Sequence, residues 1–317
     1  MHILVNGWFC GQQTAGSGQY LYFLLPQMAQ ELLAAQEQPS AHITVLLPAG
    51  AEPTFAQPLP ANVTLRQQKL PTLSKNLAKL WWEQISVPAA ARQLQADLLW
   101  VPYWAAPWWQ PVPTAVTVHD VIQLILPAYR GGLLNRLYTR LVAATARKSA
   151  SIIAVSHASK RDIVQLLGVP ESRVHVVHHG PNVEATQLLT THHALRTKYN
   201  LPERYFLYLG GFDVRKNLRG ILAAYQRYLE SGGDPGIKLL IAGKLPATDS
   251  AFLPDPRPIA AELGLTEQVH FCGWVDDADK AALYAAATAF LFPTLYEGFG
   301  MMVLEAQAAG APVISSA

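Results

Sequence analysis

The sequence predicts an α/β protein built from two doubly wound parallel sheets, and three observations support this fold class. Short β-branched runs alternate with longer helical patterns along almost the whole chain, as they do in strand–helix–strand units. Half of the residues are apolar and 15% are charged, which allows a sizeable core. The length of 317 residues exceeds that of one typical domain, so we expect two.

The first half of the chain shows strand patterns and helical patterns in alternation. Strands are expected over residues 1–6, 42–48, 63–68, 96–102, 114–120, 151–156 and 174–180. Helices are expected over 19–35, 74–94, 133–150 and 157–168. Trp81 and Trp82 lie in the second of these helices at core-like spacing, so we expect both to be buried.

The second half repeats the same rhythm after a polar segment with no strand pattern. Its strands are expected over 205–210, 237–243, 269–274, 288–294 and 312–317, and its helices over 216–230, 278–287 and 300–309. We therefore predict an N-terminal domain over 1–182, a linker over 183–203 and a C-terminal domain over 204–317. Ligands of such sheets bind beyond the carboxyl ends of the strands, so we expect the two domains to face a ligand cleft.

Composition and charge argue against several classes of function. The net charge of +2 is close to balance, whereas a nucleic-acid surface usually needs clustered positive charge. Cys10 and Cys272 are too far apart in the sequence to suggest a metal pair or a disulfide framework. No basic leader precedes the first apolar residues, and no apolar run is long enough to cross a bilayer. We expect a cytoplasmic protein.

The loop after the first predicted strand carries Gly16 and Gly18 just before a helix. Glycine amides at a helix start can approach an anion, so the loop is either a phosphate cradle or an ordinary strand–helix connection. A dinucleotide site is not supported, because Leu21 stands where the third glycine of that fingerprint would be. No acid ends the second predicted strand to hold a ribose, which also argues against an NAD enzyme.

Histidines follow two other predicted strands of the first half. His119 and Asp120 end the strand over 114–120, where an imidazole can donate a hydrogen bond to a substrate or transfer a proton. His175 and His179 share one face of the strand over 174–180, but no cysteine or carboxylate accompanies them. We therefore expect a site at His119 and no metal site.

Arg215 and Lys216 are expected at the start of the helix that follows the strand over 205–210. Cations are unfavourable at the positive end of a helix dipole, so their placement calls for an explanation. An anion held between the helix amides and these side chains would provide one.

The strongest local signal is a pair of carboxylates around a glycine-rich turn. Glu297 lies just before a predicted helix, and the amides of Phe299, Gly300 and Met301 open that helix, where they suit phosphate or sugar oxygens. Glu305 lies inside the helix among apolar neighbours, so we expect it to be paired or hydrogen-bonded. The vicinal hydroxyls of a ribose are suitable donors.

Aromatic and basic side chains also gather in the first half. Trp104, Trp108 and Trp109 lie in a proline-broken loop and are candidates for stacking on sugars. The predicted helix over 133–150 carries Arg136, Arg140, Arg147 and Lys148. These cations form either a solvated face or a contact with anionic lipid headgroups, so peripheral membrane association is the alternative to a purely cytoplasmic location.

These motifs resemble glycosyltransferase family 4 (GT4), whose members have the two-Rossmann-domain GT-B fold. Glu297 and Glu305 match the E-x7-E motif of the family within PTLYEGFGMMVLEAQAAGAPVISS. The segments IIAVSHASKRDI, FLYLGGFDVRKNL, IKLLIAGK and VHFCGWVDDADKAALYAAA also resemble family blocks in the expected order. The resemblance implies retaining transfer of a hexose from a nucleotide-diphosphate sugar, GDP- or UDP-linked, to a glycan or lipid-linked acceptor.

The resemblance also implies roles for the candidate residues. Glu297 would hold hydroxyls of the donor sugar, Glu305 would bind the ribose, and the segment around Val275 would lie near the base. Lys216, helped by Arg215, would neutralise the departing diphosphate. The remaining residues would contact sugar or phosphate: Gly16, Gly18, His119, Phe299, Gly300 and Met301. No metal and no separate cofactor are expected.

Two departures from the family pattern qualify these expectations. Gly211 stands where many relatives have an arginine, which places more of the diphosphate charge on Arg215 and Lys216. The sequence ends at Ala317, before a further strand–helix unit of the family, so we expect an incomplete second domain. Two other functions stay open, a non-hydrolysing nucleotide-sugar epimerase and an inactive sugar-nucleotide-binding module. Mannose is the favoured hexose because two segments resemble mannosyltransferases.

Overall fold

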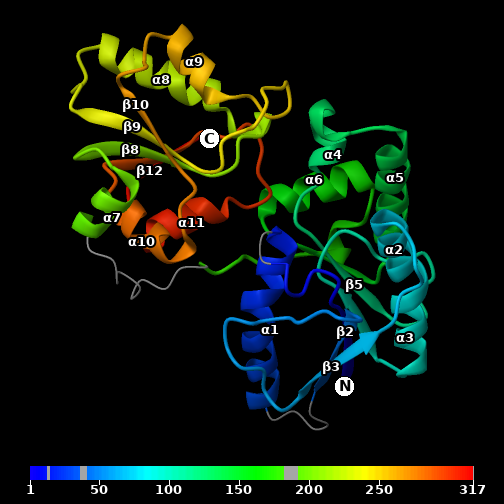
Figure 1. The fold of residues 1–317 in the computed structure, drawn as a ribbon. Helices are drawn as coiled ribbons and strands as arrows, with labels where there is room; N and C mark the ends of the chain where they lie inside the picture. Colours follow the sequence, from blue (N-terminus) through cyan, green and yellow to red (C-terminus); the bar gives the residue numbers. More distant parts are fainter. Residues whose placement is uncertain (13–14, 36–40, 182–191, 317) are drawn as a thin grey trace. The chain divides into compact units, whose positions relative to one another are not determined.

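The computed structural model describes residues 1–12, 15–35, 41–181 and 192–316, with no side-chain description at 192 and 193. The chain divides into two compact units, Met1–His178 (unit 1) and His179–Ala317 (unit 2) (Figure 1). Residues 183–191 of the predicted linker lie outside the described residues.

Unit 1 contains one seven-stranded sheet in which every neighbouring pair is parallel, with the order β3-β2-β1-β4-β5-β6-β7. All seven strands predicted for this half are present. The order reverses between β1 and β4, so the carboxyl ends of these two strands flank a topological switch point. The strands are β1 (His2–Asn6), β2 (His42–Pro48), β3 (Val63–Gln68), β4 (Leu98–Val101), β5 (Thr114–Val118), β6 (Ser151–Ala154) and β7 (Val174–Val176).

Helices cover both faces of this sheet. Successive residues of β1 point to opposite faces: Leu4 packs in one core cluster with Trp82, and Val5 packs in another with Leu21 and Leu25. The helices are α1 (Gly16–Ala34), α2 (Lys75–Trp81), α3 (Val87–Gln93), α4 (Ile122–Ile125), α5 (Leu133–Lys148) and α6 (His157–Leu167).

The helix predicted over 74–94 is interrupted by one π-helical turn, Trp82–Ser86, between α2 and α3. This turn precedes Pro88, which has no N–H to donate to the carbonyl oxygen of Gln84. The expectation that both tryptophans are buried is wrong for Trp81, which is 44% exposed, and right for Trp82, which is fully buried. Adjacent helical residues point about 100° apart, so Trp82 can face the core while Trp81 lies at the edge of the buried face.

Unit 2 contains a five-stranded parallel sheet with the order β10-β9-β8-β11-β12, which reverses between β8 and β11. Its five strands are again those predicted. They are β8 (Arg204–Leu209), β9 (Ile237–Ala242), β10 (Val269–Gly273), β11 (Ala289–Phe292) and β12 (Val313–Ser315).

The helices of unit 2 also lie on both faces of the sheet (Figure 1). Tyr208 packs with residues of α8 and α9, while Leu207 packs with residues of α7, α10 and α11. Two doubly wound α/β units are therefore present, as the sequence predicts. The helices are α7 (His192–Tyr199), α8 (Leu218–Glu230), α9 (Pro256–Glu262), α10 (Asp277–Ala285) and α11 (Met301–Ala308). Within the described residues, no helix has both the length and the apolarity needed to cross a membrane.

Candidate functional site

The candidate site of unit 2 forms at the carboxyl ends of β8 and β11, the strands that flank its topological switch point. The loop after β8 contains a 3-10 turn, Val214–Lys216, and Asn217 separates this turn from α8. Arg215 and Lys216 therefore lie in the turn before α8. The sequence predicts them at the start of the helix, whereas α8 begins after them at Leu218, because Asn217 adopts a left-handed conformation with φ of 57°.

Two hydrogen bonds fasten this turn to the loop after β11. The amide of Leu295 donates to the carbonyl oxygen of Arg215 at 2.8 Å. The side-chain amide of Asn217 donates to the carbonyl oxygen of Pro293 at 3.0 Å. The loop that carries Glu297 is thereby held beside the two cations, although about eighty residues separate them in the sequence.

Glycines at the ends of β8 and β9 allow the loops after these two strands to approach one another. The amide of Gly210 donates to the carbonyl oxygen of Ala242, and the amide of Gly243 donates to that of Gly273. A Cβ atom at Gly243 would lie 2.2 Å from the carbonyl oxygen of Gly210. Any larger residue at Gly243 would push the loops after β8 and β9 apart.

Glu297 pairs with both cations. Its Oε1 lies 2.7 Å from Nζ of Lys216, and its Oε2 accepts from Nη1 of Arg215. Nε of Arg215 lies 2.9 Å from Oδ1 of Asp213. Two cations and two carboxylates thus form one compact ionic cluster at the carboxyl edge of the sheet. An incoming anion would have to share these cations with Glu297.

Lys216 is the most buried member of this cluster, with its side chain 8% exposed. Burial lowers the pKa of Lys216, and the negative charge of Glu297 opposes this effect. Nζ of Lys216 also lies 4.9 Å from the ring centroid of Phe292, a favourable position for a cation over an aromatic face. The lysine is therefore held by the carboxylate on one side and an aromatic ring on the other.

The glycine-rich turn after Glu297 leads directly into α11. Gly300 adopts φ of 90° and caps the helix, a conformation that glycine adopts without steric cost. The amide of Val303 donates to the carbonyl oxygen of Gly300 at 2.9 Å, in the first turn of the helix. The amides of Phe299, Gly300 and Met301 come before it, at the positive end of the helix. The ring of Phe299 packs edge-on against His179 at 5.0 Å.

Glu305 lies in the second turn of α11 and is 9% exposed. Within the described residues, its carboxylate accepts a long hydrogen bond from the hydroxyl of Tyr284, at 3.5 Å. Burial raises the pKa of Glu305, and the positive charge of Lys280 opposes the shift. This weakly partnered buried carboxylate can accept further donors, which is the property expected of a ribose ligand.

Val275 follows β10, but its side chain is only 4% exposed and packs in the core of unit 2. Any contact between this residue and a base would therefore involve its main chain. The neighbouring Trp274 is 61% exposed.

In unit 1, His119 follows β5 and its ring is partly buried. Nε2 lies 3.1 Å from the carbonyl oxygen of Pro102, and the ring packs edge-on against Tyr20 at 4.9 Å. Since a carbonyl oxygen only accepts, Nε2 carries the hydrogen and the neutral ring has its lone pair on Nδ1. Burial lowers the pKa of His119, which favours this neutral form.

Gly16 and Gly18 lie in the first turn of α1 rather than before it. The amide of Gly18 donates to the carbonyl oxygen of Ala15 at 2.9 Å, and a Cβ atom there would lie 2.1 Å from the carbonyl oxygen of Gln12. Gly18 is therefore required for close backbone packing. A Cβ atom at Gly16 would meet no described atom within 4 Å.

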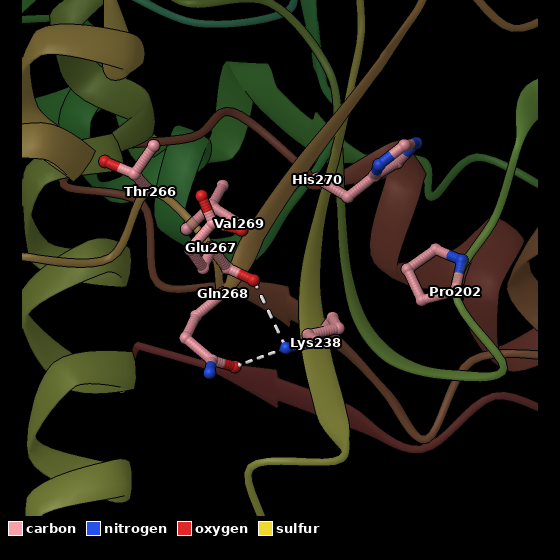
Figure 2. Close-up of a pocket in the computed structure, with 7 residues that line it drawn as sticks. All are labelled: Pro202, Lys238, Thr266, Glu267, Gln268, Val269 and His270. Carbon is pink, nitrogen blue, oxygen red and sulfur yellow. Dashed lines mark hydrogen bonds between the residues drawn. The ribbon is translucent and has the colours of Figure 1, made fainter.

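A pocket of about 340 Å³ lies elsewhere in unit 2 (Figure 2). Its lining comes from the start of β9, the start of β10 and the residue Pro202, so it opens at the amino ends of the strands. Nζ of Lys238 is already bonded to the side chain of Gln268 at 2.9 Å and to the carbonyl oxygen of Glu267 at 3.2 Å (Figure 2). None of the predicted site residues lines this pocket.

The structure therefore brings together Arg215, Lys216 and Glu297. Sequence reasoning missed three residues that support them or Glu305: Asp213, Phe292 and Tyr284. Asp213 had a weak signal, because it lies two residues before an arginine in a loop. Tyr284 had none, since it lies in the apolar stretch AALYA at the end of its helix. Among the described residues, no three His, Cys, Asp or Glu side chains are placed to hold a metal ion.

Comparisons with known proteins agree with this fold. Residues 27–185 match the model of Glycosyltransferase Family 4, and residues 193–317 match that of Glycosyl transferases group 1. The fold is similar to that of sucrose-phosphate synthase from Thermosynechococcus elongatus, with a TM-score of 0.67, 21% identity, and coverage of 100% of this chain and 81% of that one. It is also similar to Anabaena HepE in complex with UDP and glucose, with a TM-score of 0.63, 18% identity, and coverage of 99% and 80%. The chain belongs to glycosyltransferase family 4.

Curated relatives include O-antigen chain mannosyltransferase B of Escherichia coli, 30% identical over 208 residues, which are 63% of this chain and 52% of the relative. Serotype-specific mannosyltransferase WbdA of Escherichia coli is 28% identical over 65% of this chain and 25% of its own length. Glycogen synthase of Mycobacterium tuberculosis is 28% identical over 65% of this chain and 46% of its own length. The chain thus spans between a quarter and about half of the length of these relatives.

Proposed function

We propose that this chain is a retaining glycosyltransferase that moves a hexose, with mannose favoured, from a nucleotide-diphosphate sugar to a hydroxyl of a glycan or lipid-linked glycan. The observation that carries the proposal is the cluster of Glu297 with Arg215 and Lys216 at the carboxyl edge of the second sheet, with buried Glu305 in the helix that follows. The mannosyltransferase names of two relatives support the sugar, and the ligands of HepE support the class of donor.

Arg215 and Lys216 would bind the diphosphate of the donor. Both cations pair with Glu297 in the structure, so a bound diphosphate would take over part of this charge and release the carboxylate toward sugar hydroxyls. During transfer the bond from the anomeric carbon to the phosphate oxygen breaks, and negative charge accumulates on the diphosphate. Preorganised cations stabilise such charge where it develops. We propose that these two side chains do so without a metal ion.

Glu305 would accept hydrogen bonds from the ribose hydroxyls, and the main chain at Val275 would lie near the base. The amides of Phe299, Gly300 and Met301 would bind sugar and phosphate oxygens at the start of α11. The base, guanine or uracil, stays open because none of these groups distinguishes a purine from a pyrimidine.

His119 would contact the donor sugar near the reacting carbon as a neutral imidazole, and Gly16 and Gly18 would lie near the diphosphate. The amide of Gly18 is bonded to Ala15, so of the two glycines Gly16 is better placed to offer its amide. We identify no protein nucleophile. The acceptor hydroxyl would therefore attack the face from which the diphosphate leaves, and its proton would pass to the departing phosphate oxygen.

Incubation of the chain with GDP-mannose, UDP-glucose and ADP-glucose, with and without a mannan acceptor, tests this proposal. A transferase releases nucleoside diphosphate from one donor faster when acceptor is present. The variant Lys216→Met should abolish release, whereas Arg219→Met, on the exposed face of α8, should not.

Two other results would contradict the proposal. Saturable donor binding without release would indicate a sugar-nucleotide-binding module. Isomerisation of the donor sugar without transfer would indicate an epimerase, which the named relatives do not favour.

A further inference from the structure

A stripe of exposed apolar side chains runs along the helical segment from α2 to α3. Leu77, Trp81 and Ile85 are 54%, 44% and 49% exposed. They recur every four residues and so share one face, while Trp82 and Glu83 between them are buried. Single exposed apolar residues are ordinary, but an aligned set on one face indicates a surface that is covered by a partner.

Two further tryptophans extend this stripe. Trp108 and Trp109 lie in the loop between β4 and β5 and are 54% and 46% exposed. The amide of Trp108 donates to the side chain of Gln84 at 2.8 Å, which places the loop beside the π-helical turn. Nζ of Lys148 lies 3.2 Å from a ring centroid of Trp108, and the guanidinium carbon of Arg92 lies 5.8 Å from that of Trp109. Each tryptophan thus carries a cation on its ring.

The first turns of α5 add three leucines. Leu133, Leu134 and Leu137 are 73%, 81% and 49% exposed. Nζ of Lys79 lies 2.7 Å from the hydroxyl of Tyr138, which in turn donates to Glu83 at 2.8 Å. These bonds fasten α5 to α2, which lie side by side in unit 1 (Figure 1). We call the exposed apolar residues of the α2–α3 segment, the Trp108–Trp109 loop and the start of α5 the tryptophan–leucine face.

The exposed charge on the helical elements that carry this face has one sign. Residues 75–93 and 133–148 contain seven lysines and arginines and one acid, Glu83. Glu83 is fully buried, whereas Arg92, Arg136, Arg140 and Lys148 are exposed. The whole chain carries only +2, so positive charge is concentrated at this face. Its partner should therefore be anionic as well as apolar.

We propose that the tryptophan–leucine face docks on the surface of an anionic lipid bilayer. A bilayer accepts protruding leucines without a matching pocket, and tryptophan is favoured where apolar and wet regions meet. Lysine and arginine beside these rings reach the headgroup phosphates while their stems lie over apolar surface. A second copy of the chain would bring an equal excess of positive charge against the first. The proposal does not depend on the proposed transferase activity.

Co-sedimentation of the full chain with vesicles of phosphatidylcholine, with and without phosphatidylserine, tests this inference. We expect binding at least about tenfold stronger when phosphatidylserine is present, and loss of binding at high salt. The variant Arg136→Glu/Arg140→Glu should lose about tenfold or more of that binding. Arg66→Glu/Arg227→Glu makes the same change of net charge at exposed positions of β3 and α8, and should bind like the unaltered chain.

Fluorescence quenching by brominated lipids tests insertion separately. The triple variant Trp81→Phe/Trp108→Phe/Trp109→Phe should lose the quenching seen with the unaltered chain. Trp274→Phe, which changes an exposed tryptophan of unit 2, should keep it. Far-ultraviolet circular dichroism verifies that each variant is folded.

Three results would overturn the proposal. The first is equal or no binding to the two kinds of vesicle. The second is quenching that survives in the triple variant. The third is a concentration-dependent dimer in sedimentation velocity that Arg136→Glu/Arg140→Glu abolishes, which would assign this face to a second copy of the chain.

Discussion

Glu297 has two partners, and this arrangement links the stability of the site to its chemistry. The carboxylate neutralises a lysine that is almost fully buried and an arginine that is also held by Asp213. Buried charges are tolerated only when they are paired. The ion pairs that keep these loops folded are therefore the ones that a bound diphosphate would rearrange.

A double-mutant cycle on Lys216 and Glu297 tests their coupling. Each of Lys216→Met and Glu297→Gln leaves a buried group with fewer partners, so each should cost about 1–3 kcal/mol in urea unfolding. The double variant should cost less than the sum, with a coupling energy of about 1 kcal/mol or more. Additive effects would show that the pair is not energetically coupled. A parallel cycle on the exposed pair Arg219–Glu262 should give a much smaller coupling.

Replacement of Glu305 should have opposite effects on the stability of the free protein and on its affinity for nucleotide. Its folded-state pKa lies above the ordinary value of 4.5, so the folded chain holds this proton to higher pH than the unfolded chain does. The free energy of unfolding should therefore fall as the pH rises from 4.5 through the raised pKa, because ionisation is disfavoured in the folded state. Glu305→Gln should remove this contribution and leave the free protein at least as stable at neutral pH.

The same substitution should weaken the binding of nucleoside diphosphate by about tenfold or more, since a hydrogen bond to a charged acceptor is lost. Calorimetric titration across the pH range should show affinity rising with pH in the unaltered chain and not in Glu305→Gln. Glu262→Gln, on a surface ion pair, serves as the control and should bind nucleotide normally. An unchanged affinity in Glu305→Gln would refute a role for this carboxylate in nucleotide binding.

Single residues of the site differ in how far sequence alone could place them. Arg215, Lys216 and Glu297 follow neighbouring strands of one sheet, and parallel strands bring such residues to one edge. Two kinds of detail are harder to predict. One is the direction of a side chain, as for Val275, which points into the core. The other is a close approach of two backbone segments, as between Gly18 and Gln12. Both depend on contacts between distant segments, which local pattern does not encode.

At the scale of elements, the start of α1 depends on the absence of a side chain at Gly18. Replacement of glycine by alanine in a helix normally stabilises by about 0.5–1 kcal/mol. At Gly18 the added Cβ would lie 2.1 Å from the carbonyl oxygen of Gln12, so we expect Gly18→Ala to destabilise by about 1–3 kcal/mol. Gly16→Ala, whose Cβ would meet no described atom within 4 Å, should be neutral or stabilising in the same thermal unfolding experiment. Equal effects of the two substitutions would contradict this explanation.

Strands were easier to predict than helices. Every predicted strand is present, because buried parallel strands are short β-branched runs bounded by turn residues. The sequence patterns missed α4, α7 and α9, which span between four and eight residues each. α9 begins at Pro256, which suits the first position of a helix, and Asp255 caps it. The π-helical turn before Pro88 was also not predicted.

At the scale of the whole molecule, two units of one architecture carry different surfaces. Unit 2 presents an ionic cluster and a buried carboxylate at the carboxyl edge of its sheet. Unit 1 presents the tryptophan–leucine face on helices that cover its own sheet. Membership of glycosyltransferase family 4 follows from the matches over both units. The donor, the acceptor and the stereochemistry are our proposals.

The central claim is that a nucleotide-diphosphate sugar binds at the ends of β8 and β11, with Glu297 on the hexose and Glu305 on the ribose. A crystal structure of the chain with its preferred donor tests this most directly. The account predicts ribose hydroxyls within hydrogen-bond distance of Glu305, and the diphosphate against Arg215 and Lys216. A nucleotide bound at the amino ends of the strands instead, in the pocket lined by Lys238 and His270, would contradict it.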